Sequence, residues 1–227
     1  MKFILVLLVL LPSVLLAQIP VKSGWNIGVD AGTAYNHMTT KELSLNRGHW
    51  GITAGVTGSY TFRNNVMLES GLRFTDKGSD RLTGFDTQQT PFLASMTLNK
   101  LNYLEIPFMV GYKIRLSNRV SITPKVGAYY GIGVSGWGFI ENGFNTFGGR
   151  IFPFEDNPIT LGDGSQYTFG SYENLDGGFL FGMDLNIWQM TCRIAYGMSL
   201  EPVFNSYDSS NKHRTLSISV GYYLFKR

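Results

Sequence analysis

The feature of this sequence that most restricts its fold is an alternation of apolar and polar residues with a period of two, which recurs in eight segments. In one of them, Val120 and Ile122 alternate with Ser121 and Thr123. Successive side chains of a β-strand point to opposite faces, so each segment predicts a strand with one apolar and one polar face. The segments lie at 25–35, 49–62, 65–75, 102–114, 120–134, 175–187, 189–200 and 214–226.

Strand length and composition together point to a membrane. Each segment has 11 to 15 residues, and about 9–11 residues are enough for a tilted strand to cross the hydrocarbon layer. Only 15% of the 227 residues are charged, against about 25% in soluble domains. The 27 glycines exceed the usual share of about 7%. This composition favours a membrane barrel or a glycine-rich secreted sheet protein.

The distribution of charge over the two faces indicates which face meets lipid. The polar faces carry four acids and four bases, a balanced set that suits the crowded interior of a small barrel, where ions can pair. The apolar faces carry charge only at strand ends, at Arg214 and Lys226. That suits lipid, because a Lys or Arg in mid-bilayer costs about 2–4 kcal/mol. The expected lumen charge network consists of Asp30, Glu69, Arg73, Glu105, Lys113, Lys125, Asp184 and Arg193.

The connections between the segments alternate strictly between long and short. The short ones are 63–64, 115–119 and residue 188, and the long ones are 36–48, 76–101, 135–174 and 201–213. Outer-membrane barrels have long outer loops and short periplasmic turns, whereas an immunoglobulin-like sandwich has no reason for this asymmetry. The sequence therefore predicts an all-β fold, an eight-stranded antiparallel up-and-down transmembrane β-barrel. The expected aromatic girdles at the strand ends are Tyr35, Trp50, Phe62, Phe74, Tyr112 and Tyr222.

Residues 1–17 have the layout of a cleaved signal peptide. Lys2 precedes an apolar run that ends at Leu16, and the small residue Ala17 follows it. We therefore expect 18–227 to form the β-barrel domain and the protein to lie in the bacterial outer membrane.

Three residues inside the predicted strands carry expectations of their own. Cys192, the only cysteine, excludes an intrachain disulfide. It lies on an apolar face, and we interpret it as a small buried hydrophobe. Pro107 and Pro124 cannot donate to a β-ladder, so we expect a β-bulge or a locally weakened ladder near each.

One predicted strand carries a family resemblance. Residues 103–112 read YLEIPFMVGY and resemble the YLEIP strand of the PorT-like family of small outer-membrane β-barrels. The last strand, with SISVGYYL at 217–224, and the early AGTAY at 31–35 are also similar to that family. The resemblance covers essentially the whole mature chain and implies an eight-stranded barrel in the outer membrane. The name-giving member is associated with type IX secretion, so the resemblance also implies a link to secretion.

The sequence favours neither an enzyme nor a cofactor. Side chains just fill the interior of an eight-stranded barrel, so we interpret the charge network as a paired core in preference to a proton or ion path. His213-Arg214-Thr215 faintly resembles the His-x-Ser pair of lipid A deacylases, but Thr replaces Ser and no glycine-rich oxyanion context is present. The acidic residues of 155–163 do not match a calcium loop. A net charge of +3 is too small to indicate nucleic acid.

The loop 135–174 is the most unusual segment, because it holds nine aromatic residues. Disordered loops are poor in aromatics, so we expect this loop to be ordered, either as extensions of its flanking strands or as a lid over the barrel. Exposed aromatic patches commonly mark ligand sites, although packing of the rings on one another explains them equally well. The expected ligand-binding residues are Trp137, Phe139, Phe144 and Phe147.

Three functions follow from these patterns. The first is a monomeric barrel, surrounded by outer-membrane lipid and lipopolysaccharide, with a filled lumen. Its outer loops, chiefly 135–174, would bind a surface partner or ligand, either an envelope protein, a glycan or lipopolysaccharide. The second is an accessory component of an envelope secretion machine of the type IX kind. The third is an enzyme that modifies lipid A.

Overall fold

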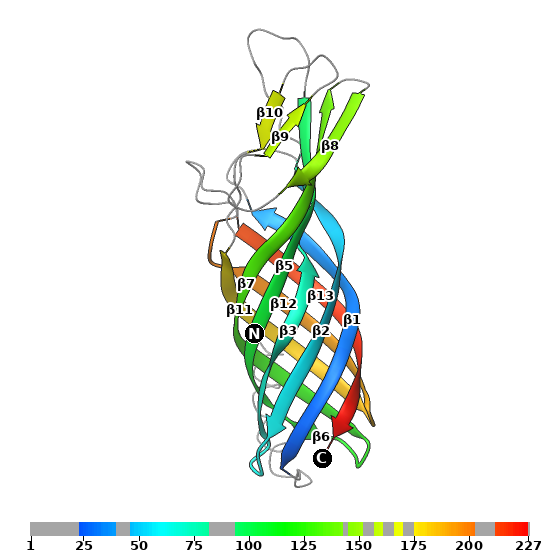
Figure 1. Ribbon diagram of the computed structural model, residues 1–227. Coiled ribbons are helices and arrows are strands. Elements are labelled where there is room, and N and C mark those ends of the chain that lie inside the picture. Colours follow the sequence, from blue (N-terminus) through cyan, green and yellow to red (C-terminus); the bar gives the residue numbers. More distant parts are fainter. Residues whose placement is uncertain are drawn as a thin grey trace, which may run out of the picture.

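Eight long strands form one closed antiparallel β-barrel in the computed structural model (Figure 1), as the alternation predicts. They are β1 (Gly24–Thr39), β2 (Asn46–Thr61), β3 (Val66–Asp76), β5 (Ala94–Tyr112), β7 (Val120–Asn142), β11 (Leu175–Ile187), β12 (Met190–Ser199) and β13 (Lys212–Lys226). The residues that the structure describes are 23–39, 46–81, 94–142, 145–151, 157–160, 166–169, 175–202 and 212–226. The expected signal peptide at 1–17 lies outside them.

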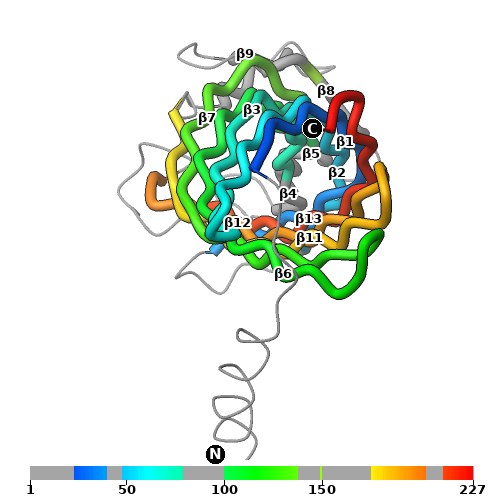
Figure 2. The backbone as a smooth tube through the Cα atoms, turned by 90° about the horizontal axis from the view of Figure 1, so that it is seen from below, coloured from blue at the N-terminus to red at the C-terminus, as the bar shows by residue number. Residues whose placement is uncertain are grey.

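The barrel closes because its first long strand pairs with its last. Ala31 of β1 lies opposite Ala54 of β2 on one side and opposite Val220 of β13 on the other. The remaining long strands pair with their neighbours in chain order. Figure 2 shows the resulting ring from below. Closure leaves these eight strands without a free edge, which a hydrocarbon environment requires because it offers no partners to unpaired backbone groups.

Five short strands lie at the two ends of the barrel. They are β4 (Ser79–Arg81), β6 (Ile114–Arg115), β8 (Asn145–Ile151), β9 (Asn157–Thr160) and β10 (Gln166–Phe169). β8 pairs with the outer end of β7, and β9 pairs with β10. β8, β9 and β10 lie beyond one end of the barrel, whereas β6 and the C-terminus lie at the other end (Figure 1). The end with β8, β9 and β10 is the long-loop end, and the end with β6 and the C-terminus is the short-turn end.

The barrel wall has a polar inner face and an apolar outer face, as the charge distribution predicts. On β11 and β12, Asp184 is fully buried whereas the neighbouring Leu185 and Ile194 are exposed. The buried side chains of the barrel are mostly polar, and its exposed side chains are mostly large and apolar. This is the inverse of a soluble protein and matches a wall that faces hydrocarbon. In the described segments, no helix is long and apolar enough to cross a bilayer.

Two glycines on the inner face permit neighbouring strands to approach closely. A Cβ atom at Gly127 would lie 1.9 Å from the carbonyl oxygen of Phe108, on the adjacent strand β5. A Cβ atom at Gly32 would lie 2.0 Å from the carbonyl oxygen of Ile218 on β13. Any larger residue would push these strands apart, so the tight wall of this small barrel depends on glycine at both positions.

Both prolines interrupt one of the two ladders of their strand, as the sequence predicts. Pro107 pairs with β7, but the β3–β5 ladder lapses between the pairs Ser70–Phe108 and Arg73–Glu105. Pro124 pairs with β11 on one side of its strand. On the other side the ladder has a gap, because β5 ends there and β6 begins only further along the chain. The register continues unchanged across both gaps, so each proline weakens a ladder without a bulge.

The strands β5 and β7 run further than expected. Residues 94–101 and 135–142 were predicted to belong to loops, but they continue these strands beyond the barrel and pair with each other. The register shifts between Thr97 and Lys100 and between Asn102 and Tyr103. These irregularities break the simple alternation that marks a strand in the sequence. The loop expectation is therefore wrong for 94–101, whereas 135–142 confirm one of the two expected arrangements of their loop, an extension of the flanking strand.

The expected character of Cys192 also needs correction. The residue lies on the apolar face, as predicted, but its side chain is exposed. In this barrel the apolar face is the outer one, so Cys192 faces hydrocarbon and is not enclosed in a core.

Aromatic residues occupy both ends of the outer wall. Tyr35 and Trp50 stack in a tilted arrangement with their ring centroids 5.1 Å apart, near the long-loop end. Trp25, Tyr60 and Phe62 form a continuous row near the short-turn end, with successive centroids 5.0 and 4.8 Å apart. These positions match the aromatic girdles of membrane barrels.

The lipid-facing wall predicts a depth-dependent cost of charge. Replacing Ile218, exposed in the middle of β13, with Arg should lower the free energy of unfolding by about 2–4 kcal/mol. Replacing Leu224, close to the end of that strand, with Arg should cost at most about 1 kcal/mol. Urea unfolding in lipid vesicles measures both. Equal losses at the two positions would show that this face does not meet hydrocarbon.

Candidate functional site

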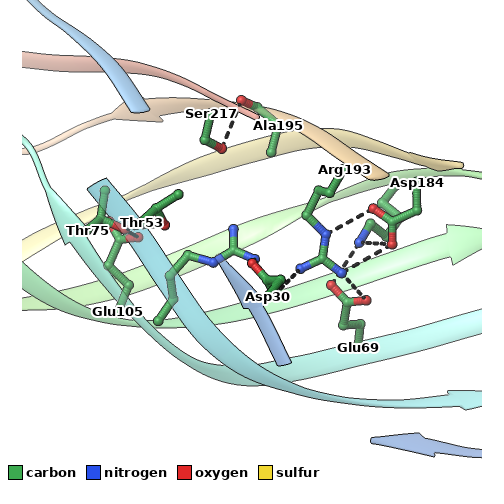
Figure 3. A network of polar contacts seen from close by, with 11 residues as sticks. Asp30, Thr53, Glu69, Thr75, Glu105, Asp184, Arg193, Ala195 and Ser217 are labelled. Atoms are coloured by element: carbon green, nitrogen blue, oxygen red, sulfur yellow. Dashed lines mark hydrogen bonds and ion pairs between the residues drawn. The ribbon is translucent and has the colours of Figure 1, made fainter. Parts of the chain in front are cut away.

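The middle of the lumen is occupied by a network built around Arg193 of β12. The Arg193 guanidinium contacts three carboxylates, each from a different strand (Figure 3). Its Nε lies 2.9 Å from Asp184 Oδ1, its Nη1 lies 3.3 Å from Asp30 Oδ2, and its Nη2 lies 3.0 Å from Glu69 Oε2. One side chain thus ties β1, β3 and β11 to β12 across the barrel.

Two further bases complete this set. Lys125 Nζ of β7 lies 2.8 Å from both Glu69 Oε1 and Asp184 Oδ2. Arg73 Nη2 of β3 lies 3.2 Å from Asp30 Oδ1. The central network therefore has three acids and three bases, and all six are buried. Buried charges are tolerated when they are paired and hydrogen-bonded, which this arrangement achieves.

A second group of buried polar residues lies nearer the long-loop end. Lys77 Nζ lies 2.5 Å from Glu105 Oε1 and 2.6 Å from Asp176 Oδ2. The ammonium group also lies over the ring of Tyr129, 4.2 Å from its centroid. The Tyr129 hydroxyl and Ser199 Oγ both donate to the Asp176 carboxylate, at 3.2 and 2.6 Å. These five residues form the outer cluster.

His213 lies beside the outer cluster in a fully enclosed position. Its side chain is only 2% exposed, and its ring stands edge-on to Tyr103 with the centroids 5.7 Å apart. Neither ring nitrogen has a hydrogen-bond partner in the described part of the chain. The Thr215 hydroxyl donates to Asn36 Oδ1 at 2.8 Å. The histidine is thus not hydrogen-bonded to the threonine that would replace the serine of a deacylase pair.

The structure brings seven of the eight predicted lumen charges into these two groups, six into the central network and Glu105 into the outer cluster. The eighth, Lys113, lies elsewhere. It follows the end of β5 at the short-turn end, near Arg115 and Lys226. Burial and these two positive neighbours lower the pKa of Lys113 to about 8. The structure thus brings Lys113 into neither group, because it lies past the point where β5 ends.

Sequence reasoning missed Lys77 and Asp176, although both continue an inward-facing series. Asp176 lies an even number of positions from Asp184 on β11, so the two side chains share the inner face. Lys77 likewise lies an even number of positions from Arg73, one residue beyond β3. Lys77 was assigned to an outer loop, since the predicted strand ended at residue 75. Asp176 lay within the predicted segment 175–187 and was overlooked on its polar face, whereas Lys77 required the inward series to be followed one step past the predicted end at residue 75.

The space left inside the barrel is small. A void of about 20 Å3 separates the central network from the outer cluster. It is lined by Arg73, Lys77, Glu105 and Tyr129, among others. A space of this size holds about one water molecule. The lumen is therefore closely packed with side chains at this level. These residues also contain no group of three or more His, Cys, Asp or Glu that could hold a metal ion.

The predicted ligand-binding aromatics lie on one hairpin beyond the barrel. Trp137 is on β7 and 37% exposed, and it lies opposite Lys100 of β5 and Arg150 of β8. Phe139 is also in β7, and Phe147 is in β8, opposite Ile140. Phe144 falls outside the described residues.

The barrel geometry agrees with comparisons to known proteins. Residues 16–205 match the family model of the outer membrane protein beta-barrel domain. Among curated proteins, none matches this sequence.

Several solved structures have a similar overall shape. One is the attachment invasion locus protein Ail of Yersinia pestis in complex with the heparin analogue sucrose octasulfate, with 13% identity, a TM-score of 0.42, and coverage of 90% of this chain and 100% of that one. Another is Neisserial surface protein A, with 13% identity, a TM-score of 0.44, and coverage of 88% and 98%. A de novo designed transmembrane β-barrel has 14% identity, a TM-score of 0.36, and coverage of 91% and 100%. Likenesses of this order carry no information on function.

The central network predicts a large loss of stability when its middle is removed. Replacing Arg193 with Met leaves Asp30, Glu69 and Asp184 buried with one fewer base. We expect the free energy of unfolding to fall by about 3–5 kcal/mol, measured by urea unfolding in lipid vesicles. Replacing Arg63, exposed in the β2–β3 turn, with Met is the control and should change stability little. A loss below about 1 kcal/mol for the Arg193 variant would contradict the network.

Removal of the Lys113 side chain should have the opposite effect and raise the free energy of unfolding, with a characteristic pH dependence. Its pKa falls from 10.5 to about 8 on folding, so below pH 8 the folded barrel carries a buried ammonium that the unfolded chain keeps in water. Lys113→Met should therefore raise the free energy of unfolding at pH 7 by at least about 1 kcal/mol, since one pKa unit corresponds to about 1.4 kcal/mol. The difference should shrink between pH 8 and 10.5, where the wild-type lysine loses its proton. A pH series of unfolding curves in uncharged detergent tests this, and a constant difference would refute it.

Proposed function

This chain belongs to the family of the outer membrane protein beta-barrel domain, and on that premise we propose that it is a surface-binding protein with a closed lumen. It lies in the bacterial outer membrane as an eight-stranded barrel. The binding surface that we propose is the sheet that β5, β7 and β8 form beyond the barrel. Its β7 and β8 parts belong to the outer segment 135–174 that the sequence singles out, and β5 adds residues from the preceding connection.

The packed lumen supports binding in preference to transport. The central network and the outer cluster cross the barrel at successive levels, and they join strands on opposite sides of the ring. A solute would have to break several buried ion pairs to pass. Each broken pair would leave an uncompensated charge in a space with almost no water. A barrel of this kind works through its surface.

The projecting sheet is the observation that carries the proposal. β5 and β7 stay paired up to Ala94 and Asn142, well past the last lumen contacts, and β8 adds a third strand. Figure 1 shows this sheet standing clear of the barrel. Strand pairing, although interrupted by two register shifts, fixes the position of this sheet relative to the membrane, so it can present side chains at low entropic cost.

The residues at the root of this sheet favour an acidic partner. Lys100 is exposed on β5, and Trp137 is exposed beside it on β7. Arg150 lies opposite Trp137 in the register of β7 with β8. An exposed aromatic residue beside an exposed lysine, with an arginine at the register position on its other side, suits acidic sugars, phosphorylated glycans or acidic protein segments. The finer resemblance to the PorT-like family, and the secretion role that it implies, remain predictions beside this proposal.

Photo-crosslinking in intact cells tests the proposal. A benzophenone amino acid would replace Trp137 or Phe147 in the projecting sheet, and Ile218 on the lipid-facing wall would serve as the control. We expect a discrete protein or glycan adduct from the two sheet positions, and lipid adducts alone from position 218. Replacing Lys100 with Gln should lower the adduct yield from position 147 severalfold.

Two outcomes would decide against the proposal as stated. Adducts with lipid alone at both sheet positions would remove the surface-binding function. An adduct with an envelope protein, together with retention of exported proteins in the periplasm after deletion of the gene, would establish the secretion role instead.

A further inference from the structure

A groove of about 650 Å3 lies at the short-turn end of the barrel, away from the proposed binding sheet. It lies between the turn that follows β6 and the turn that joins β11 to β12, next to the end of β13. Its lining has two parts of opposite character. One part is apolar and consists of Ile187, Met190 and Tyr222. The other part is cationic and consists of Arg119 and Lys226.

The apolar part belongs to the outer wall. Ile187, Met190 and Tyr222 are all about half exposed, on the face that meets hydrocarbon. They come from three successive strands, and Met190 and Tyr222 lie directly opposite each other. This part of the groove therefore opens toward the acyl chains of the bilayer.

Trp188 is fixed at the boundary between the two parts. Its φ is 56°, a left-handed conformation that residues other than glycine rarely adopt. The backbone N–H of Trp188 donates to the backbone carbonyl of Arg119 at 2.8 Å, and Lys226 Nζ donates to the backbone carbonyl of Trp188. The Arg119 guanidinium lies over the indole, 4.8 Å from the ring. These contacts hold two cationic side chains and an exposed indole together in one corner of the groove.

Several bases gather at the short-turn end among the described residues. Lys113, Arg119 and Lys226 form no ion pair with a carboxylate in the described segments. The pKa of Lys113 is lowered to about 8 by burial, by Lys226 and by Arg115, which shows that positive groups gather here. The lumen, in contrast, pairs its central bases with acids one for one. An anion at the turns would relieve the repulsion among these cations.

An occupant of this groove must combine an anionic head group with an apolar tail at this depth in the membrane. Short turns lie on the periplasmic side of outer-membrane barrels, and the leaflet on that side consists of phospholipid. Tryptophan belongs at the level of lipid headgroups. We propose that this groove is a binding site for a phospholipid of the periplasmic leaflet. The phosphate would lie between Arg119 and Lys226, and one acyl chain would follow Ile187, Met190 and Tyr222.

This site differs from the proposed surface function in place and ligand. It would anchor the short-turn end of the barrel to chosen lipids, while the projecting sheet acts outside the cell. Either proposal can fail without the other, because their tests use different residues at opposite ends of the molecule.

Native mass spectrometry of the full-length barrel in uncharged detergent tests the site. The protein is titrated with phosphatidylglycerol, phosphatidylcholine or inorganic phosphate. The variants are Arg119→Gln, Lys226→Gln and the double variant. Arg63→Gln is the matched control, since Arg63 is an exposed arginine in another short turn. A heat-shift gel confirms that each variant folds.

We expect one phosphatidylglycerol to bind tightly, and the double variant to bind it at least tenfold more weakly. Arg63→Gln should stay within twofold of the wild type. Equal binding by all variants would overturn the proposal. So would tenfold stronger binding of phosphate than of the lipid, because the site would then recognise a free ion.

Quenching of Trp188 by lipids brominated on the acyl chain gives a second readout that does not depend on charge removal. Phosphatidylglycerol labelled in this way should quench wild-type fluorescence at a lower mole fraction than labelled phosphatidylcholine. Trp188→Phe should abolish the difference, whereas Trp25→Phe, at another point of the same end, should preserve it. Loss of the preference in both tryptophan variants, or in neither, would refute a lipid site at Trp188.

Discussion

Hydrocarbon offers no hydrogen-bond partner to a backbone N–H or C=O, and the structure follows from this restriction. Every long strand has to pair on both sides, which an open sheet cannot achieve. The pairing of β1 with β13 completes the ring. Closure in turn separates an enclosed polar face from an outer apolar face. The arrangement of charges, glycines and aromatic residues then follows from which of the two faces each residue occupies.

The interior shows how a small barrel accommodates charge. Its central network sets three acids against three bases within hydrogen-bonding distance, and the outer cluster encloses Lys77 between two carboxylates. Removing water from ions is costly, so close pairing is required. The same pairing fills the middle of the lumen with buried side chains.

The sequence allows most of the barrel to be predicted, since alternation reports directly on the two faces of a strand. Seven of the eight predicted lumen charges lie in the two ion-paired groups for this reason. Lys113 lies outside both groups, because the alternation continues beyond Tyr112 although β5 ends there. The extension of β7 was one of the two arrangements expected for its loop, whereas the extension of β5 was not expected, because register shifts near Lys100 and Asn102 disturb the alternation. Trp188 gave no signal, since its role depends on a turn conformation and on Arg119 and Lys226 from distant segments.

The central network also bears on how the barrel is made. Asp30 enters with the first strand, whereas Asp184 and Arg193 belong to β11 and β12, near the end of the chain. A partly assembled wall would hold the early carboxylates without their later partner. Insertion strand by strand into lipid would therefore pass through states in which Asp30 and Glu69 are paired with Arg73 and Lys125 but still lack Arg193. The network thus reaches its full set of ion pairs only in the last steps of assembly, close to closure of the seam between β1 and β13.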